Sequence, residues 1–530
     1  MEFINMHRMI NPWLMFAAVL PLVGCGGGGS GTDKSKTVGG QSSSTAWVSG
    51  VYPPAANFIN RCELPRQGKS PITNQNYPDT KGSYVDENNF LRSWSQDTYL
   101  WYRELVDRNP ANYPDTENYF NLLKTNAKTS SGADKDKYHY SMDSDEYAAL
   151  SQSGLRYSYG MELAFIRNVP PRELRVIYVQ PGSPAALQSI TRGSKIVGVD
   201  GVDLVNNNTS AGINTLNRGL FPDAAGQAHT FDIQKPGASQ SVSIVMQSAR
   251  VTSVPVQQVK TLDTETGKVG YFAFHDHIAP AEVALRDAIA QLQGESISDL
   301  VIDLRYNGGG YLAIASQLAY MIAGASATES KTFELMQFND KYPTRNPITG
   351  AALTPEPFLD YALGFSLAYG TALPSLNLSR VFVLTGSGTC SASEALMNGL
   401  RGIDVQVIQI GNTTCGKPYG FYSQSNCGTT YFSVQFRGVN AKNFGDYTEG
   451  FFPSAVDDGQ SRVRGCIVAD DYSHELGNPV EARLAAALYF RENGTCPGVA
   501  VSGSQKPSGT VVDDGVMLKP DVLNSAWMHY

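Results

Sequence analysis

Three short segments of the sequence hold residue types that could together catalyse acyl transfer. Ser391 and Ser393 lie in the run TCSASE, at the start of an apolar-periodic helix pattern. Lys417 follows in TTCGKPYG, and the glycines from Gly308 to Gly310 end the run DLRYNGGG. A serine hydroxyl can attack a carbonyl, a lysine can take its proton, and glycine N–H groups can bind the oxyanion that forms. The residue types therefore indicate covalent catalysis by an activated serine.

Ser391 lies where the chain enters the helix, and this position favours a nucleophile. The first N–H groups of a helix lack intrahelical acceptors and carry the positive end of the helix dipole. We therefore expect Ser391 to attack the carbonyl, with the N–H groups of Ala392, Gly309 and Gly310 forming an oxyanion hole. Ser393 is the other candidate nucleophile, but two residues into the helix its side chain should point elsewhere and pack or cap.

Lys417 can accept a proton only in its neutral form. Its pKa must therefore fall from about 10.4 towards 7, a change that corresponds to roughly 4–5 kcal/mol. Burial among apolar groups lowers the pKa of a lysine in this way. The residues around Lys417 are suitably uncharged. We expect Lys417 to be the general base.

Neighbouring residues offer competing chemistry that the sequence leaves open. Cys390 could be a thiol nucleophile, but it would need a lowered pKa or a nearby histidine, and its part of the sequence has none. His275 and His277, in the run FHDHI, are alternative bases and, less favoured, a metal-binding pair. Glu394 is expected to stabilise the start of the helix rather than to transfer protons.

An α/β domain must position these segments, because strand and helix patterns alternate from residue 253 to residue 497. SDLVIDLRYNGGG reads as a buried strand that enters a glycine turn, and PAEVALRDAIAQLQ reads as an amphipathic helix. Each of the three segments follows a strand of this kind. The ends of strands are where α/β folds tend to build sites, so we expect the site at these loops. Asp303 and Arg305 are expected to hold the glycine loop.

Two further regions precede this domain. Residues 61–155 place aromatic residues at helical intervals and read as a helical N-terminal region that frames the next domain. Residues 156–252 alternate short strands with turns, and their GSPAA and KIVGVDG elements resemble a PDZ domain of bacterial proteases. Such domains bind a peptide C-terminus as an added strand. A small β-domain used only for packing is the alternative. The residues expected to bind the peptide are Tyr159, Gly160, Met161 and Leu163.

Together the three segments resemble the signature of the carboxy-terminal processing peptidases, also called tail-specific proteases. The family's SASE matches Ser391–Glu394, its T-x-G-K matches Thr414–Lys417, and its D-L-R-x-N-x-G-G matches Asp303–Gly310. The resemblance implies a multidomain α/β protein with a helical N-terminal region, a PDZ domain and a ClpP/crotonase-like serine peptidase domain.

The same resemblance implies a mechanism and a substrate. Ser391 and Lys417 would form a Ser–Lys dyad, and an acyl-enzyme would be formed and hydrolysed. The substrate would be an exported protein or peptide with a free C-terminus, cleaved near that end after the PDZ domain has engaged the tail. The resemblance implies no metal, no organic cofactor and no particular oligomeric state.

The sequence departs from the family pattern around the predicted dyad. Phe421 stands where many members carry a glutamine that orients the lysine, and Glu162 of the PDZ segment stands where glycine is common. Six cysteines remain after Cys25, an even number that favours disulfides in an exported chain but allows 15 pairings. If Cys390 and Cys415 pair, a disulfide would join the nucleophile segment to the base segment, and activity would be sensitive to reductant.

The first residues read as an export signal. The apolar stretch up to Gly24 is too short to span a bilayer as a mature helix, and its Leu-Val-Gly-Cys ending resembles a bacterial lipoprotein cleavage box. We expect residues 1–24 to be removed, Cys25 to be lipidated, residues 25–60 to form a Gly/Ser-rich tether and residues 498–530 to form a C-terminal extension. An ordinary secretory signal is the alternative. The expected location is the envelope of a Gram-negative cell, anchored in the outer membrane and facing the periplasm or the surface.

Charge argues against one broad class of function. The formal net charge is −8 and no basic stripe occurs, which argues against nucleic acid as the main partner.

A catalytically inactive PDZ-bearing scaffold lipoprotein is the second hypothesis, suggested by the missing glutamine and the two cysteines at the site. A ligand-binding protein on a related fold is the third. Retention of the serine, the lysine and the glycine loop together favours the peptidase.

Overall fold

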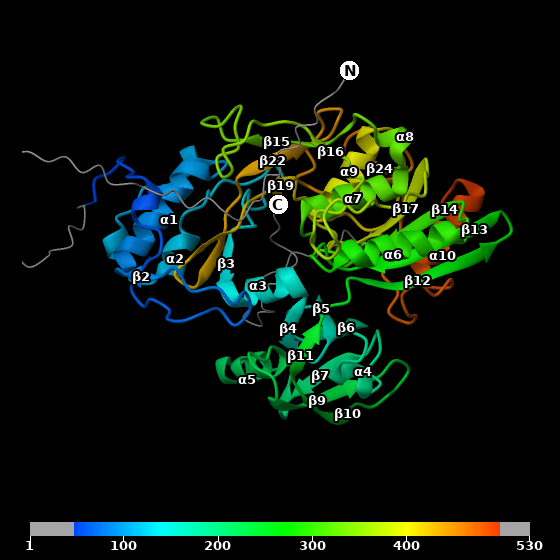
Figure 1. Ribbon diagram of the computed structural model, residues 1–530. Helices are drawn as coiled ribbons and strands as arrows, with labels where there is room; N and C mark the ends of the chain where they lie inside the picture. The colour runs from blue at the N-terminus through cyan, green and yellow to red at the C-terminus, as the bar shows by residue number, and fades with distance from the viewer. Residues whose placement is uncertain (1–46, 499–530) are drawn as a thin grey trace, which may run out of the picture. The chain divides into compact units, whose positions relative to one another are not determined.

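The computed structural model describes residues 47–498 (Figure 1). The predicted signal segment, the lipidation site Cys25 and the first part of the predicted tether lie outside the described residues. The predicted extension beyond residue 498 lies outside them as well. Within residues 47–498, no helix is both long and apolar enough to cross a membrane.

A seven-stranded sheet forms the centre of the C-terminal region. Its strand order is β12-β13-β14-β17-β18-β24-β23, and every neighbouring pair except β12 with β13 is parallel. Every residue of β14 is buried, as expected for a parallel strand that is covered on both faces. The strands are β12 (Val256–Thr264), β13 (Gly267–Phe274), β14 (Asp299–Asp303), β17 (Arg380–Thr385), β18 (Gln406–Gly411), β23 (Phe452–Ser454) and β24 (Arg462–Ile467).

Helices cover both faces of this sheet (Figure 1). On one face, α6, α7 and α9 pack into one hydrophobic cluster with strand residues such as Ile302, and on the other face α10 packs with residues such as Val301. Because successive strand residues point to opposite faces, one continuously apolar strand contributes to both layers. The helices are α6 (Ala281–Gly294), α7 (Leu312–Ala323), α9 (Ala392–Gly402) and α10 (Ala482–Asn493).

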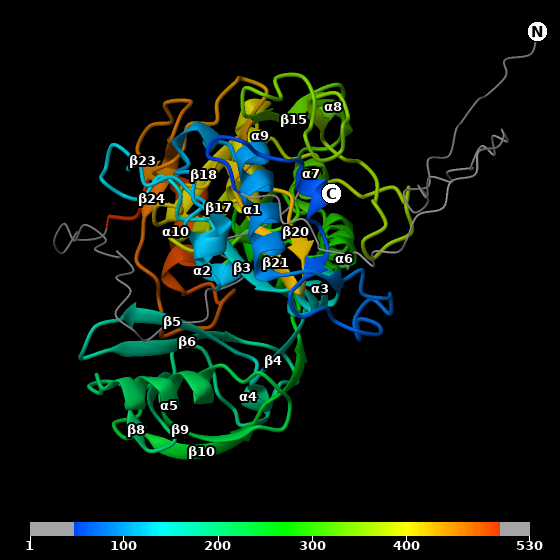
Figure 2. The same ribbon diagram turned by 90° about the vertical axis from the view of Figure 1, so that its left-hand side faces the viewer.

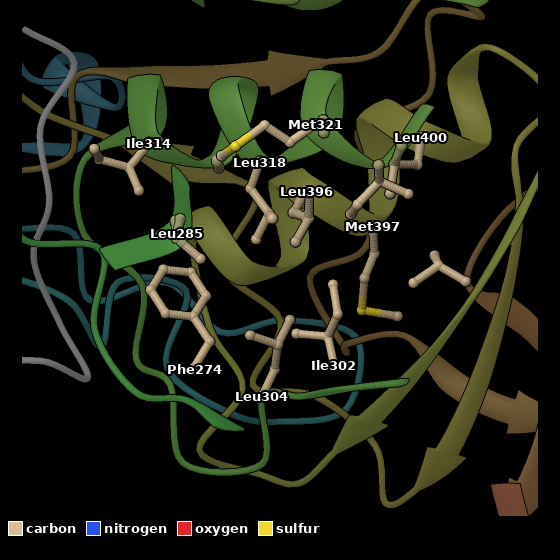
Figure 3. Close-up of a cluster of buried hydrophobic side chains, with 14 of the residues drawn as sticks. Phe274, Leu285, Ile302, Leu304, Ile314, Leu318, Met321, Leu396, Met397 and Leu400 are labelled. Atoms are coloured by element: carbon tan, nitrogen blue, oxygen red, sulfur yellow. The ribbon is translucent and has the colours of Figure 1, made fainter. Parts of the chain in front are cut away.

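The core between the sheet, α7 and α9 fixes the two helices that follow predicted site loops. Figure 3 shows Leu318 and Met321 of α7 near Leu396 and Met397 of α9, with Ile302 of β14 on the sheet side. All five side chains are buried almost completely. Burial of each such side chain contributes about 1.5–3 kcal/mol, so the start of α9 is held firmly in place.

Two smaller sheets extend the α/β region near the predicted base. One has the strand order β16-β15-β22-β19, and the other has the order β20-β21-β3. Strand β19 begins two residues after Lys417, so the base segment leads directly into the first of these sheets. The strands are β15 (Thr332–Phe338), β16 (Glu356–Pro357), β19 (Tyr419–Gly420), β20 (Gln424–Asn426), β21 (Thr429–Phe432) and β22 (Phe436–Val439).

The N-terminal region contains helices, and it is joined to the α/β region by strand pairing and by a disulfide. Strand β3 (Tyr140–Asp143) pairs with β21, and Cys62 forms a disulfide with Cys427. The sequence led us to expect that this region frames the β-rich domain. Strand pairing and the covalent bond instead fasten it to the α/β region, because both of their partners lie beyond residue 425. The helices are α1 (Tyr84–Thr98), α2 (Thr116–Asn121) and α3 (Ser144–Ser153).

A separate sheet with its own hydrophobic cluster occupies the segment in which we predict the PDZ domain. Its strand order is β10-β9-β7-β6-β5, with β8 paired to β7, so β5 is an edge strand. Figure 2 shows helix α5 (Ser210–Leu220) beside this sheet, where it packs against β7 and β8. The other elements are α4 (Pro184–Leu187), β5 (Met161–Arg167), β6 (Glu173–Val179), β7 (Lys195–Val199), β8 (Val202–Asp203), β9 (Ala228–Gln234) and β10 (Val242–Gln247).

One further strand pair and three disulfides connect distant parts of the chain. Strands β4 (Leu155–Ser158) and β11 (Ala249–Thr252) pair with each other where the chain enters and leaves the β-rich domain. The six cysteines of the described residues form the bridges Cys62–Cys427, Cys390–Cys415 and Cys466–Cys496. The second of these is the pairing that would join the nucleophile segment to the base segment.

Candidate active site

Ser391 immediately precedes helix α9, and its backbone is strained. Its φ of 55° and ψ of −116° lie in a region that residues other than glycine rarely adopt. Its N–H donates to Oε2 of Glu394 at 3.0 Å. A strained residue persists only when its surroundings hold it, and such residues cluster at functional sites. A serine on a strained turn into a helix is the arrangement that presents a nucleophile to substrate.

The glycine loop after β14 passes directly beside Ser391. A Cβ atom at Gly309 would lie 2.7 Å from the Cβ of Ser391, and one at Gly310 would lie 2.4 Å from the carbonyl oxygen of His277. The φ angles of the two glycines are 105° and 139°. Both the backbone conformation and the close approach therefore require glycine at these two positions.

The N–H groups of this site differ in their availability. Gly309 donates its N–H to Oδ1 of Asn307 at 2.9 Å, so it is not available as the oxyanion donor that the sequence led us to expect. The reason is that the Asn307 side chain folds back to cap its own loop. Among the described residues, the N–H groups of Gly310 and Ala392 have no protein acceptor. These two N–H groups, one from the loop and one from the helix start, remain for an oxyanion.

The competing nucleophiles are engaged in structural contacts. Ser393 is fully buried, and its hydroxyl donates to the carbonyl oxygen of Asn307 at 3.1 Å. Cys390 is joined to Cys415, so it offers no thiol. The thiol alternative is therefore wrong for the disulfide-bonded protein, because oxidation removes the nucleophile. Ser393 instead fastens α9 to the glycine loop.

The two histidines contact different residues around the site and do not form a metal-binding pair. Nδ1 of His277 lies 3.0 Å from Oδ1 of Asn307, and burial lowers the pKa of His277 to about 3. The ring of His275 stacks on Tyr178 at 3.9 Å, and burial lowers its pKa to about 4. Within the described residues, neither ring hydrogen-bonds to Ser391. A neutral His277 therefore acts on Asn307 and the loop rather than on the serine.

Lys417 is almost completely buried at the end of its loop. Its Nζ lies 4.5 Å from the ring centroid of Phe421 and 5.1 Å from that of Tyr138. Burial lowers the pKa of Lys417 to about 7, while the negative charges of Asp136 and Glu394 act in the opposite direction. This value lies close to the one that we require for a base that works at neutral pH.

Glu394 does more than cap the helix. Its carboxylate accepts the N–H of Ser391 at 3.0 Å and, on the other side, the N–H groups of Gly416 and Lys417, each at 2.8 Å. It also accepts the hydroxyl of Thr414 at 2.5 Å. Burial raises the pKa of Glu394, and these hydrogen bonds oppose that rise. The sequence identified the cap, but the bonds to the base loop connect residues more than 20 positions apart.

The disulfide adds a covalent link between the same two loops. Cys390 and Cys415 have their Cα atoms 5.2 Å apart. Beside the bridge, the N–H of Cys415 donates to the carbonyl oxygen of Thr389 at 3.0 Å. Three independent links therefore hold the nucleophile loop against the base loop: the bridge, this backbone bond and the carboxylate of Glu394.

A pocket brings the two predicted catalytic side chains together. Ser391, Lys417 and Gly310 line a cavity of about 290 Å³, its open mouth included. Most of its other walls are apolar or aromatic. They are Leu312, Glu334, Ala395, Pro418, Tyr419, Gly420, Phe436 and Tyr447. The pocket therefore holds a serine, a buried amine and the unpaired N–H group of Gly310 at one place.

A larger polar cavity, of about 820 Å³ with its open mouth included, lies at the other end of the sheet strands, around Asp299 and Arg380. These residues begin β14 and β17, whereas the glycine loop and the serine segment follow the ends of the same strands. Within it, the carboxylate of Asp299 is paired with Arg380 and Arg491.

The predicted peptide-binding residues lie at the start of β5. Met161 and Leu163 belong to this edge strand, and Gly160 precedes it with a φ of 77°. Tyr159 is buried, and its ring packs edge-on against Phe231 in the domain core. A bound peptide could therefore meet only the backbone of Tyr159.

Asp303 and Arg305 hold the glycine loop within a buried charge network. Arg305 donates to both oxygens of Asp303 and, at 2.7 Å, to Oδ1 of Asp470. Arg192, from the β-rich domain, donates to the same Asp470 oxygen at 2.7 Å and to the hydroxyl of Tyr306 at 2.6 Å. Buried charges are stable only when they are paired in this way. The β-rich domain thus contacts the residues that lead into the glycine loop.

The α/β region thus combines the groups that covalent catalysis by a serine requires. They are a strained serine at a helix start, a buried lysine on the adjoining loop and a glycine loop beside the serine. Residues 268–424, which run from β13 through the base segment, match the model of peptidase family S41. This segment therefore resembles that family.

Two curated relatives carry names that refer to carboxyl-terminal processing. The carboxyl-terminal-processing protease of a Picosynechococcus species is 28% identical over 195 residues, which make up 35% of this chain and 43% of the relative. The chloroplastic carboxyl-terminal-processing peptidase 2 of Arabidopsis thaliana is 24% identical over 237 residues, 43% of this chain and 42% of the relative. The chain thus spans less than half the length of the curated relatives that it matches.

A solved structure shares the fold. The crystal structure of a putative S41 protease from Bacteroides fragilis superposes with a TM-score of 0.57 at 22% identity. The match covers 79% of this chain and 99% of that chain. The shared fold therefore extends well beyond the segment that defines the family.

Proposed function

We propose that this protein is a serine endopeptidase in which Ser391 is the nucleophile and Lys417 is the general base. The observation that carries the proposal is the buried Lys417, which has a pKa of about 7 and lines the same pocket as Ser391. A lysine with an ordinary pKa is protonated at neutral pH and cannot accept the serine proton.

In the proposed reaction, the Ser391 oxygen attacks the scissile carbonyl while Nζ of neutral Lys417 takes the hydroxyl proton. The N–H groups of Gly310 and Ala392 stabilise the oxyanion of the tetrahedral intermediate. The ammonium of Lys417 then gives its proton to the leaving amine, and the C–N bond breaks to leave an acyl-enzyme. Water then attacks the ester while Lys417 takes its proton. The C–O bond to Ser391 breaks, the ammonium of Lys417 returns that proton to the Ser391 oxygen, and the carboxylic acid product leaves.

The proposed substrate is an exported protein that is cleaved near its C-terminus. Two relatives are named for carboxyl-terminal processing, and we transfer this substrate class to the chain. The β-rich domain is proposed to act as a PDZ domain, in which a substrate tail adds to the free edge of β5 by main-chain hydrogen bonds. The contacts of Arg192 with Asp470 and Tyr306 support communication between that domain and the glycine loop.

The proposed location is the Gram-negative cell envelope, with a lipid on Cys25 as the anchor. The support is the apolar stretch that ends in Leu-Val-Gly-Cys and the Gly/Ser-rich run that follows. Labelling of cells with radioactive palmitate tests the proposal. Label on the wild-type protein that is lost in Cys25→Ser, together with release into the soluble fraction, is expected. Equal labelling of both proteins would refute it.

The catalytic proposal is tested by intact-mass measurement of the soluble body, residues 26–530, after treatment with a serine-reactive fluorophosphonate. We expect one adduct on Ser391 that is absent from Ser391→Ala and Lys417→Ala, and cleavage of an unfolded protein that is lost in both. A substrate with an amidated C-terminus should be cleaved more slowly than its free-acid form. Cleavage that survives Lys417→Ala would move the base elsewhere, and absence of both label and cleavage would favour the scaffold.

A further inference from the structure

The residue at position 421 cannot orient the base through a hydrogen bond. Phe421 presents a flat apolar face, with its ring centroid 4.5 Å from Nζ of Lys417. A catalytic side chain on a flexible stem is effective only when neighbouring groups fix its end. If Lys417 is the base, groups from another part of the chain must help to set its position and charge.

A segment of the N-terminal region lies directly against the base loop. The hydroxyl of Tyr138 donates to the carbonyl oxygen of Gly416 at 2.7 Å, and Nζ of Lys137 donates to that of Cys415 at 3.0 Å. These are the last two carbonyl groups before Lys417. The Tyr138 ring centroid lies 5.1 Å from Nζ of Lys417, so this ring is the second aromatic group at the end of the lysine.

Asp136 places a buried carboxylate at the start of this segment. Only 1% of the residue is exposed. Its Oδ1 accepts the N–H of Tyr138 at 3.0 Å, and its Oδ2 accepts the hydroxyl of Tyr99 at 2.7 Å. The Tyr99 oxygen in turn accepts the N–H of Thr125 at 3.1 Å. Because both oxygens are bound, the carboxylate is fixed in position relative to the Tyr138 ring and to the base beyond it.

We propose that Asp136 and Tyr138 are positioning residues of the catalytic base and replace the glutamine that is absent from position 421. In this arrangement the Tyr138 ring excludes water from Nζ and holds it towards the pocket. Asp136 supplies the negative charge that favours the ammonium form of Lys417. The inference rests on the proposed function, and it assigns to the N-terminal region a part in the chemistry.

The two residues act on the base in opposite directions. Burial, to which the Tyr138 ring contributes, lowers the pKa of Lys417, and Asp136 is the foremost of the charges that raise it. The other titratable groups that face the base or Asp136 come from several elements. They are Glu394, Glu334, Tyr419 and Tyr447 around the pocket, and Tyr99, Lys137 and His139 around Asp136. Burial lowers the pKa of His139 to about 4, so it is neutral where Lys417 titrates.

The test measures the titration of Lys417 by NMR of [ε-¹³C]lysine in the Ser391→Ala protein, with the signal assigned by its loss in Lys417→Met. Asp136→Asn keeps the shape of the side chain but removes its charge, so the midpoint should fall by about one pH unit. Asp134→Asn is the matched control, because Asp134 is more than half exposed and paired with Lys128. It should leave the midpoint unchanged.

A second pair of variants tests the ring. Tyr138→Ala admits water to Nζ and should raise the midpoint towards the ordinary lysine value, whereas Tyr138→Phe keeps the ring and should hold it near that of the parent. This pair keeps the proposal falsifiable even if Asp136→Asn does not fold. In the protein that retains Ser391, the acid limb of the pH profile of kcat/KM should shift in the same direction as the NMR midpoint of each variant.

Two outcomes would overturn the proposal. One is a midpoint in Asp136→Asn that equals that of Asp134→Asn. The other is a Tyr138→Ala midpoint that equals that of Tyr138→Phe. Because the NMR titration uses a protein without the serine, it does not depend on peptidase activity. Lack of cleavage by the wild-type protein would therefore count against the proposed function, and an unmoved midpoint against this inference.

Discussion

Removal of the Cys390–Cys415 disulfide tests whether this bridge aligns the proposed catalytic residues or only stabilises the fold. Ser391 follows Cys390 directly, and Lys417 follows Cys415 by two residues. A Cα–Cα distance of 5.2 Å across the bridge therefore limits how far the nucleophile loop and the base loop can move apart. We consider the double variant Cys390→Ser/Cys415→Ser, which leaves the other two bridges intact.

The expected loss of stability follows from the length of the closed loop. For a sequence separation of 25, the chain-entropy relation gives a loss of about 3.5 kcal/mol in the free energy of unfolding. Displacement of a catalytic group by about 1 Å costs on the order of a hundredfold in rate, so kcat should fall by about tenfold to a hundredfold. Activity should not vanish, because Glu394 still binds the N–H groups of Ser391 and Lys417.

The chain offers a matched control for this experiment. The Cys466–Cys496 bridge has a sequence separation of 30, for which the same relation gives about 3.6 kcal/mol, and it joins β24 to the segment after α10. Urea denaturation in a Ser391→Ala background measures stability, and hydrolysis of a peptide under non-reducing conditions measures kcat and KM. The reasoning is refuted if both double variants lose similar stability and the Cys390/Cys415 variant loses no more kcat than the control.

Three further predictions concern the base and its carboxylate neighbour. The pKa of Lys417, about 7, predicts that kcat/KM falls tenfold for each pH unit below 7, and a flat profile from pH 5 to pH 8 would contradict it. Between pH 7 and pH 10.5 the unfolded chain binds a proton on Lys417 that the folded chain lacks. Burial of Lys417 therefore lowers the free energy of unfolding by up to about 5 kcal/mol at pH 7 and below. Lys417→Met should therefore unfold at higher urea than the wild type at pH 7, and the difference should shrink as the pH rises towards 10.5. Glu394→Gln replaces an acceptor of four hydrogen bonds by an amide, so it should lose about 3 kcal/mol of stability and most of kcat/KM; unchanged values in urea denaturation and peptide hydrolysis would show that the carboxylate does not join the loops.

The local parts of the site could be predicted from the sequence because each is encoded within a few residues. Ser391 was found from the small polar run before an apolar helix, and Lys417 from an uncharged run after a strand. The central sheet followed from the alternation of strand and helix patterns. The glycine loop was found as a triplet, but the sequence could not show that the Asn307 side chain occupies the N–H of Gly309. That bond depends on the path of the loop in three dimensions.

Contacts between distant segments left no local signal. Glu394 reads as a helix cap because Ser391 lies three residues before it, whereas its bonds to Gly416 and Lys417 depend on how two loops meet. Arg192 stands in an ordinary turn of the β-rich domain, and its partner Asp470 lies 278 residues later. From the sequence alone, a local role is enough to explain each of these residues. The sequence therefore does not predict their contacts with distant segments.

The N-terminal region shows most clearly why the site is larger than its motifs. The alternating pattern delimits a domain from residue 253 to residue 497, and that segment contains Ser391, Lys417, Glu394 and the glycine loop. It does not contain Tyr138, which contributes to the burial of Lys417, or Cys62 and β3, which fasten the N-terminal region to the α/β region. A lysine exposed by the loss of this cover would keep a pKa near its ordinary value and stay protonated at neutral pH. The motifs contain the proposed reacting groups, but burial by a distant segment is what would make one of them a base.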